Sequence, residues 1–141
     1  MKKFASVTGL ALLGLSLLSS AAQAGDLQVE VQGLNDIKGD VMVAVFNQKG
    51  QWLKQALHSK KVSASQLSLT VQFENLPEGD YAVSVFHDLN SNGRLDSNVI
   101  GIPTEPYGFS NDAAGNFGPP SFDAAKVTLT QDKKVISVRL N

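Results

Sequence analysis

The chain has 141 residues, of which 43% are hydrophobic and 18% charged, and its formal net charge is −1. It contains no cysteine, which excludes disulfides and thiolate metal sites. Lysine and arginine form no run longer than a pair, so the sequence indicates no electrostatic binding surface for nucleic acid or for an anionic membrane.

The amino-terminal segment has the pattern of a secretory signal peptide. A lysine pair precedes an apolar stretch over residues 4–18, and small residues then lead to Ala24. The apolar stretch is shorter than the roughly 20 residues of a membrane-spanning helix, and no lipid-bearing cysteine follows it. We therefore expect residues 1–24 to be a signal peptide and residues 25–141 to be one periplasmic or secreted domain without a membrane anchor. The alternative is that this segment is not cleaved and remains as a membrane anchor.

Alternation of apolar and polar residues then recurs along the chain and predicts strands with one buried face. Two strands of this kind are expected at residues 27–31 and at residues 67–73, the latter beginning with Leu67. Residues 41–46, and nearly all of residues 81–86, are apolar on both faces, which indicates central strands or strands whose second face another segment covers.

Only residues 51–57 suggest a helix, with Trp52 on its apolar side. We interpret Trp52 as a lid over one sheet, because amphipathic segments usually cover core; stacking on a ligand is the alternative. Residues 127–130 and 135–140 are expected to be the last two strands, joined by residues 131–133 as a hairpin turn. The sequence thus predicts an all-β fold, a single β-sandwich of about seven strands with one long ordered loop.

Residues 88–96 hold oxygen-bearing side chains at a spacing that can wrap a chain around a hard cation such as Ca²⁺. Gly93 permits the sharp turn between them. The expected metal ligands are the side chains of Asp88, Asn90, Asn92 and Asp96 and the carbonyl of Arg94.

The same segment also fits a hairpin loop that needs no metal, in which Asp and Asn side chains bond their own backbone. An EF-hand would place a bidentate Glu where Val99 stands, and its loop would lie between helices, so this is not an EF-hand. Water molecules or Glu105 would have to complete a calcium shell. The sequence leaves both interpretations open.

Residues 103–122 form a long segment without periodicity, which is typical of a functional loop or of a misread element. Its aromatic residues are too many for a disordered linker. They are Tyr107, Phe109, Phe117 and Phe122. Packing against the sandwich is the simpler interpretation, and a ligand-stacking platform is the alternative.

The sequence indicates no catalytic residues and no cofactor site. His58 and His87 are the only histidines, and the chain has no nucleophile elbow, phosphate-binding loop or dinucleotide fingerprint. His87 adjoins Asp88, but neighbouring residues of a strand point to opposite faces, so the two cannot form a dyad without a bend.

Several motifs resemble one exported bacterial family, known as domain of unknown function 2141. They are LPEGDYAVSVFHD at residues 76–88, the Asp/Asn loop after it, Gly-Ile-Pro at residues 101–103, YGFSN at residues 107–111 and FGPPSF at residues 117–122. The resemblance covers nearly all of the chain after the predicted signal peptide and implies export, without an activity that could be carried over. The step Leu-Pro-x-Gly-x-Tyr is also similar to immunoglobulin-like and prealbumin-like sandwich modules, where it turns the chain into a core strand.

Two functions are compatible with this sequence. One is a non-catalytic binding or accessory module of the bacterial envelope, steadied by Ca²⁺ if the loop binds it, whose long loop contacts a protein, peptide or glycan. The other is a small periplasmic hydrolase or transthyretin-like enzyme that uses His87 with Asp88 or Asp96. A pocket-lining His87 bonded to a carboxylate would favour the enzyme, whereas a His87 turned into the sandwich or bonded only to backbone would favour the module.

Overall fold

A computed structural model describes residues 23–141. Residues 1–22 of the predicted signal peptide therefore lie outside the described residues. The strands are β1 (Ala24–Gln32), β2 (Asp40–Phe46), β3 (His58–Ser63), β4 (Leu69–Pro77), β5 (Gly79–Asp88), β6 (Tyr107–Phe109), β7 (Val127–Leu129) and β8 (Lys134–Arg139). The helices are short: η1 (Lys49–Gln51), η2 (Ser110–Asp112) and α1 (Phe122–Ala125). Within the described range, no helix is long and apolar enough to cross a membrane.

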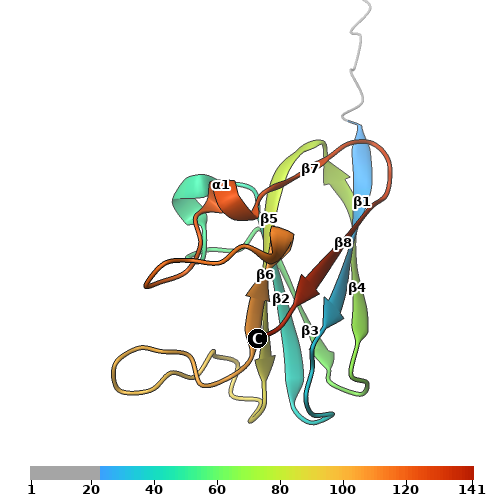
Figure 1. Ribbon diagram of the computed structural model, residues 1–141. Coiled ribbons are helices and arrows are strands. Elements are labelled where there is room, and N and C mark those ends of the chain that lie inside the picture. Colours follow the sequence, from blue (N-terminus) through green and yellow to red (C-terminus); the bar gives the residue numbers. More distant parts are fainter. Residues whose placement is uncertain (1–22) are drawn as a thin grey trace, which may run out of the picture.

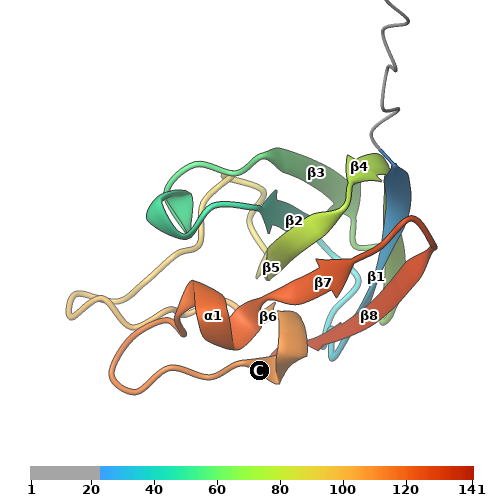
Figure 2. The same ribbon diagram turned by 90° about the horizontal axis from the view of Figure 1, so that it is seen from above.

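Two sheets form the layers of a β-sandwich (Figures 1 and 2). The smaller sheet has the order β4-β1-β8, and the larger has the order β3-β2-β5-β6, with β7 also paired to β5. Strand β1 pairs in parallel with β8, and the other pairings are antiparallel. The predicted all-β sandwich is confirmed, with eight strands in the described part of the chain.

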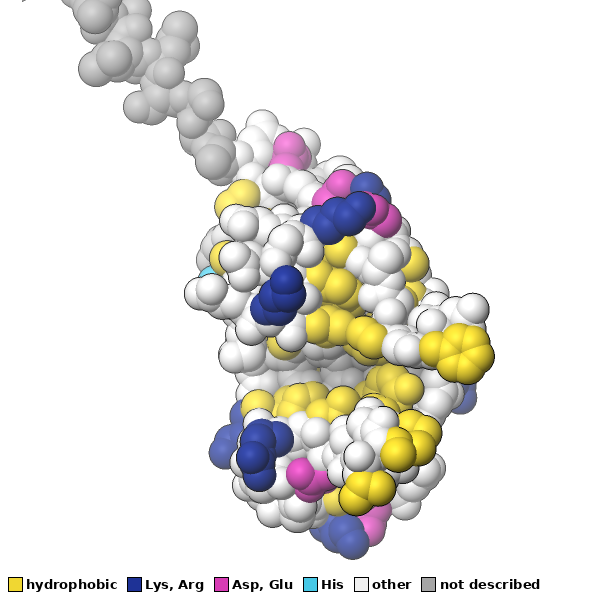
Figure 3. All heavy atoms as spheres, turned by 90° about the vertical axis from the view of Figure 1, so that its left-hand side faces the viewer, with side chains coloured by type: hydrophobic (Ala, Val, Ile, Leu, Met, Phe, Trp, Pro, Cys, Tyr) yellow, Lys and Arg dark blue, Asp and Glu magenta, His cyan; other side chains and the backbone are white. Residues whose placement is uncertain are grey.

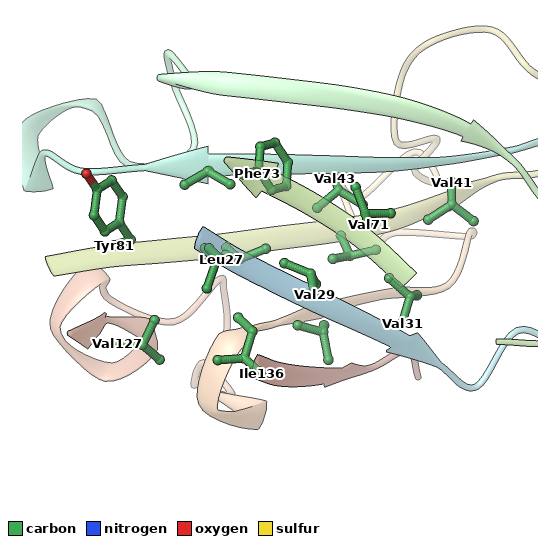
Figure 4. Close-up of a cluster of buried hydrophobic side chains, with 14 of the residues drawn as sticks. Leu27, Val29, Val31, Val41, Val43, Val71, Phe73, Tyr81, Val127 and Ile136 are labelled. Atoms are coloured by element: carbon green, nitrogen blue, oxygen red, sulfur yellow. The ribbon is translucent and has the colours of Figure 1, made fainter. Parts of the chain in front are cut away.

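The core between the sheets follows from the period-two pattern of the sequence. In the smaller sheet, Leu27, Val29 and Val31 of β1 are completely buried. They lie in one cluster with inward-facing side chains of β2 and β5 in the larger sheet (Figure 4). Burying one such side chain stabilises the fold by about 1.5–3 kcal/mol, so the alternation fixes which face of each strand points inward.

A second apolar cluster covers part of the outer face of the larger sheet. Phe46 of β2 and Ala82 of β5 are buried there beneath Phe109, Phe122 and the indole of Trp52. The Trp52 ring lies 5.0 Å from the Phe46 ring, and its Nε1 donates a hydrogen bond to the Pro120 carbonyl at 2.8 Å. The prediction of Trp52 as a lid is confirmed, and other segments cover part of the second face of β2 and β5, as one of the two interpretations of these strands predicts.

The predicted hairpin at residues 131–133 is wrong. Strand β7 pairs with β5 in the larger sheet, whereas β8 pairs with β1 in the smaller sheet. Residues 130–133 therefore carry the chain from one layer to the other. The crossing packs against Gly25, where an added Cβ atom would lie 2.1 Å from the Thr130 carbonyl oxygen.

Three further expectations need correction. The predicted helix at residues 51–57 is a turn that follows η1. The strand expected to begin with Leu67 begins at Leu69, and Leu67 is exposed. The edge strand β3 was not predicted. The segment at residues 103–122 is also not one continuous loop, since β6 and η2 lie within it.

Strand β6 joins the two layers through the carboxyl end of the chain. The backbones of Tyr107 and Asn141 exchange hydrogen bonds, while the Leu140 N–H donates to the Gln32 carbonyl of β1 at 2.8 Å. Gly108 permits this approach, because a Cβ atom there would lie 2.3 Å from the Arg139 carbonyl oxygen.

We expect Gly108→Ala to lower the free energy of unfolding by about 2 kcal/mol or more, since the methyl group would meet backbone that cannot move aside. Gly50→Ala is the matched control, because an added Cβ atom there has no neighbour within 4 Å. Urea denaturation of both variants measures the difference. Equal stabilities would contradict the close packing of β6 on the carboxyl end.

Candidate functional site

The Asp/Asn loop after β5 is ordered by hydrogen bonds to its own backbone. The Asp88 side chain is completely buried, and its two carboxylate oxygens accept from the Asn92 N–H at 3.1 Å and the Gly93 N–H at 2.7 Å. Gly93 has a φ of 78°, the left-handed conformation that a glycine adopts without strain. Asp88 therefore holds the turn in shape.

The other predicted ligands converge beside this turn. The Nδ2 atoms of Asn90 and Asn92 donate to the Asp96 carboxylate at 2.6 Å and 2.9 Å, and the Arg94 N–H donates to Oδ1 of Asn92 at 2.9 Å. The bonds from Asn92 and then Asn90 lower the pKa of Asp96, which keeps the carboxylate ionised. The structure thus brings Asn90, Asn92 and Asp96 together.

Glu105 closes the base of the loop. It is nearly buried, and its two carboxylate oxygens accept from the Leu89 N–H and the Asp96 N–H, each at 2.9 Å. Each carboxylate of the loop therefore already has hydrogen-bond donors. Among residues 23–141 there is no group of three or more His, Asp or Glu side chains placed to hold a metal ion.

His87 points into the end of the sandwich. It is completely buried, and Nε2 lies 2.7 Å from the Lys38 carbonyl oxygen, while Nδ1 has no hydrogen-bond partner in the described part of the chain. Asp88 and Asp96 make their bonds elsewhere, with backbone amides and asparagine side chains. Among residues 23–141, the only hydrogen-bond partner of the His87 imidazole is therefore a backbone carbonyl.

The aromatic residues of the long segment divide into two groups. Phe109 and Phe122 are buried in the outer cluster, and Tyr107 packs beside them with its ring 5.8 Å from that of Phe109. Phe117 is fully exposed, with a φ of 58°. Three of the four rings therefore pack, and one projects into solvent.

The outer face of the larger sheet also carries an apolar groove of about 870 Å³, beside the cluster that contains Trp52. The floor of the groove is formed by residues on the outer face of β2, β5 and β6. There Ala44 pairs with Ser84, and Phe86 pairs with Tyr107. Figure 3 shows the hollow with hydrophobic side chains along both sides. The cover over the sheet is thus incomplete, and the uncovered part is apolar.

Two loops that project from the same side of the sandwich in Figure 1 contribute to the walls. The loop between β5 and β6 supplies Ile100 and Ile102, and the loop before α1 supplies Phe117. Leu53 lines the groove beside Trp52. These four large apolar residues are exposed, so they do not contribute the stabilisation that burial of apolar side chains normally provides.

Backbone strain marks the same rim. Leu53 (φ 56°) and Phe117 (φ 58°) are the two apolar residues with a left-handed backbone conformation among residues 23–141. That conformation is costly for a bulky side chain. Leu53 and Phe117 therefore combine an exposed apolar side chain with a costly backbone conformation, a combination that folding stability alone does not favour.

The comparison with known families agrees with the sequence motifs. Residues 29–137 match a family described as "Uncharacterized protein conserved in bacteria (DUF2141)". The chain belongs to this family. No curated protein and no solved structure matches the chain. The DUF2141 description names no activity.

For this DUF2141 protein we expect different results from truncating two aromatic residues that line the groove, Phe109 and Phe117. Phe109→Ala removes a buried ring and should cost about 3–5 kcal/mol of unfolding free energy. Phe117→Ala removes an exposed ring and should change stability by less than about 0.5 kcal/mol. Thermal or urea unfolding distinguishes them, and a large loss from Phe117→Ala would contradict its position at the rim.

Proposed function

We propose that the protein is a non-catalytic binding module of the bacterial envelope whose groove receives an apolar ligand. The observation that carries this proposal is the apolar groove whose rim holds exposed and strained hydrophobic side chains. Contiguous exposed apolar surface commonly marks a binding site, and about 870 Å³ lies in the range of small-molecule sites. The envelope location rests on the signal-peptide pattern of residues 1–24.

The alternative of a hydrolase or transthyretin-like enzyme has less support. Neither histidine lines the groove, and His87 contacts a backbone carbonyl inside the sandwich. The buried hydroxyl of Ser110 is also engaged, since it accepts from the Val83 N–H and donates to the Ala125 carbonyl. These contacts support structural roles for both residues.

The geometry favours an apolar ligand over a glycan. Glycans bring many hydroxyl groups that need hydrogen-bond partners when they leave water. The floor of the groove offers few, since its strands use their backbone groups within the sheet and Ser84 and Tyr107 supply the only side-chain hydroxyls of the lining. An aromatic platform of several exposed rings is also missing, because Tyr107, Phe109 and Phe122 pack against the domain.

A fluorescence titration with N-phenyl-1-naphthylamine, an uncharged apolar dye, tests this function. We expect saturable enhancement in the wild type and about tenfold weaker binding by Ile102→Glu, which places a charge at the rim. Leu67→Glu is the matched control, because Leu67 is 58% exposed against 55% for Ile102 and lies outside the groove. Absence of saturable binding, or equal loss in both variants, would contradict the proposal.

Calcium binding by the loop at residues 88–96 is a separate proposal. Rotating the side-chain amides of Asn90 and Asn92 would turn their oxygens toward the Asp96 carboxylate, which a cation between them would favour. Only two carboxylates belong to this ligand set and no bidentate Glu closes it, so we expect weak binding, with a dissociation constant of about 0.1 to 1 mM.

With a dissociation constant of about 1 mM, about 10 mM Ca²⁺ should raise the melting temperature by roughly 5 °C relative to chelator, and Mg²⁺ should raise it less. Asp96→Ala should abolish the shift, whereas Asp132→Ala, an exposed acid outside the loop, should preserve it. A wild-type shift below about 1 °C would show that hydrogen bonds alone hold the loop.

A further inference from the structure

The groove contains one charged side chain. Lys54 lines it next to Leu53, and no Asp or Glu is among the lining residues. The ion pairs of residues 23–141 involve Lys38, Lys49 and Lys126, so the Lys54 ammonium group has no protein carboxylate as partner there. A single positive charge at an otherwise apolar groove is complementary to a ligand with one anionic end.

The rest of the groove requires a ligand portion with almost no polar groups. Its floor is the face of a sheet, and the backbone groups of the paired residues Ala44, Ser84 and Phe109 are used between strands. An extended peptide gains affinity from main-chain hydrogen bonds along a sheet edge, which this face does not offer. A hydrocarbon chain needs no such partners and gains from each methylene that it buries.

We propose, on the basis of the binding role proposed above, that the ligand is a free single-chain amphiphile with an anionic head group. Its hydrocarbon chain lies on the floor between the walls that carry Ile102 and Phe117, and its head group pairs with Lys54. The floor and the two walls provide affinity, and Lys54 selects the sign of the head-group charge.

The test uses three probes that share one chain length and differ in head group: decanoate and decyltrimethylammonium below their micelle concentrations, and decanol below its aqueous solubility. Titrations followed by amide chemical shifts of Ala44, Ser84 and Ile102 report both affinity and location. We expect all three residues to shift with decanoate and decanol, with decanoate binding about threefold to fivefold more tightly. This advantage is the size expected for one exposed ion pair.

Lys54→Gln should remove the advantage of decanoate over decanol and leave decanol binding unchanged. Lys61→Gln is the matched control, because Lys61 is an exposed lysine of β3 outside the groove, and it should preserve the advantage. Added salt should narrow the difference in the wild type, since the charges are exposed.

Two kinds of failure are distinguishable. Equal binding of decanoate and decanol, equal binding of decyltrimethylammonium, or a decanoate advantage that persists in Lys54→Gln would overturn the head-group assignment while the groove remains a binding site. If none of the probes shifts the floor residues, the groove itself is not a binding site. Sedimentation of the protein with anionic vesicles, without binding of monomeric decanoate, would likewise overturn the proposal of a free amphiphile.

Discussion

Strands β2 and β5 carry apolar side chains on both faces, and both faces have to be kept from water. The inner face is buried, mainly against the smaller sheet. The outer face is covered only in part, by Trp52, Phe109 and Phe122. Because the strands run on beyond this cover, a strip of apolar surface remains, and the groove is that strip. The outer cluster and the groove are therefore two consequences of one constraint, and the position at which the cover ends determines where a ligand can lie.

The groove is bounded by structures of different physical kinds. On one side, Trp52 and its aromatic neighbours are held mainly by packing, with rings 5.0 to 6.1 Å apart. On the other side, the loop between β5 and β6 is held by polar bonds: Glu105 ties its two ends, and Oδ1 of Asn98 accepts from the N–H groups of Ile100 and Ile102. These bonds of Glu105 and Asn98 hold, without a metal, a loop whose apolar side chains form one wall of the groove.

Much of the fold could be predicted from the sequence, because period-two alternation directly reports which face of a strand is buried. Prediction from the sequence failed where this alternation is weak. Strand β3 is an exposed edge strand with little apolar character, and β6 is three residues long with Gly108 at its centre. Alternation also carries no information about pairing partners, so β7 and β8 were joined as a hairpin although they belong to different layers.

The Asp/Asn loop was found because its predicted ligands are contiguous in the sequence. The groove was not, since Ala44, Ser84, Ile102 and Phe117 come from separate segments; its only signals were two strands apolar on both faces and an excess of aromatic residues.

The exposure of the rim has a consequence for how this fold can diverge. Ile100, Ile102 and Phe117 contribute little to stability, because their side chains remain in water. Substitutions there can change the shape and chemistry of the opening with small effects on folding. Substitutions at Phe46 or Phe109 would instead damage both the groove and the stability of the fold. Selection on ligand preference and selection on a stable fold therefore act on different residues, and the sandwich can serve as a constant frame beneath a variable opening.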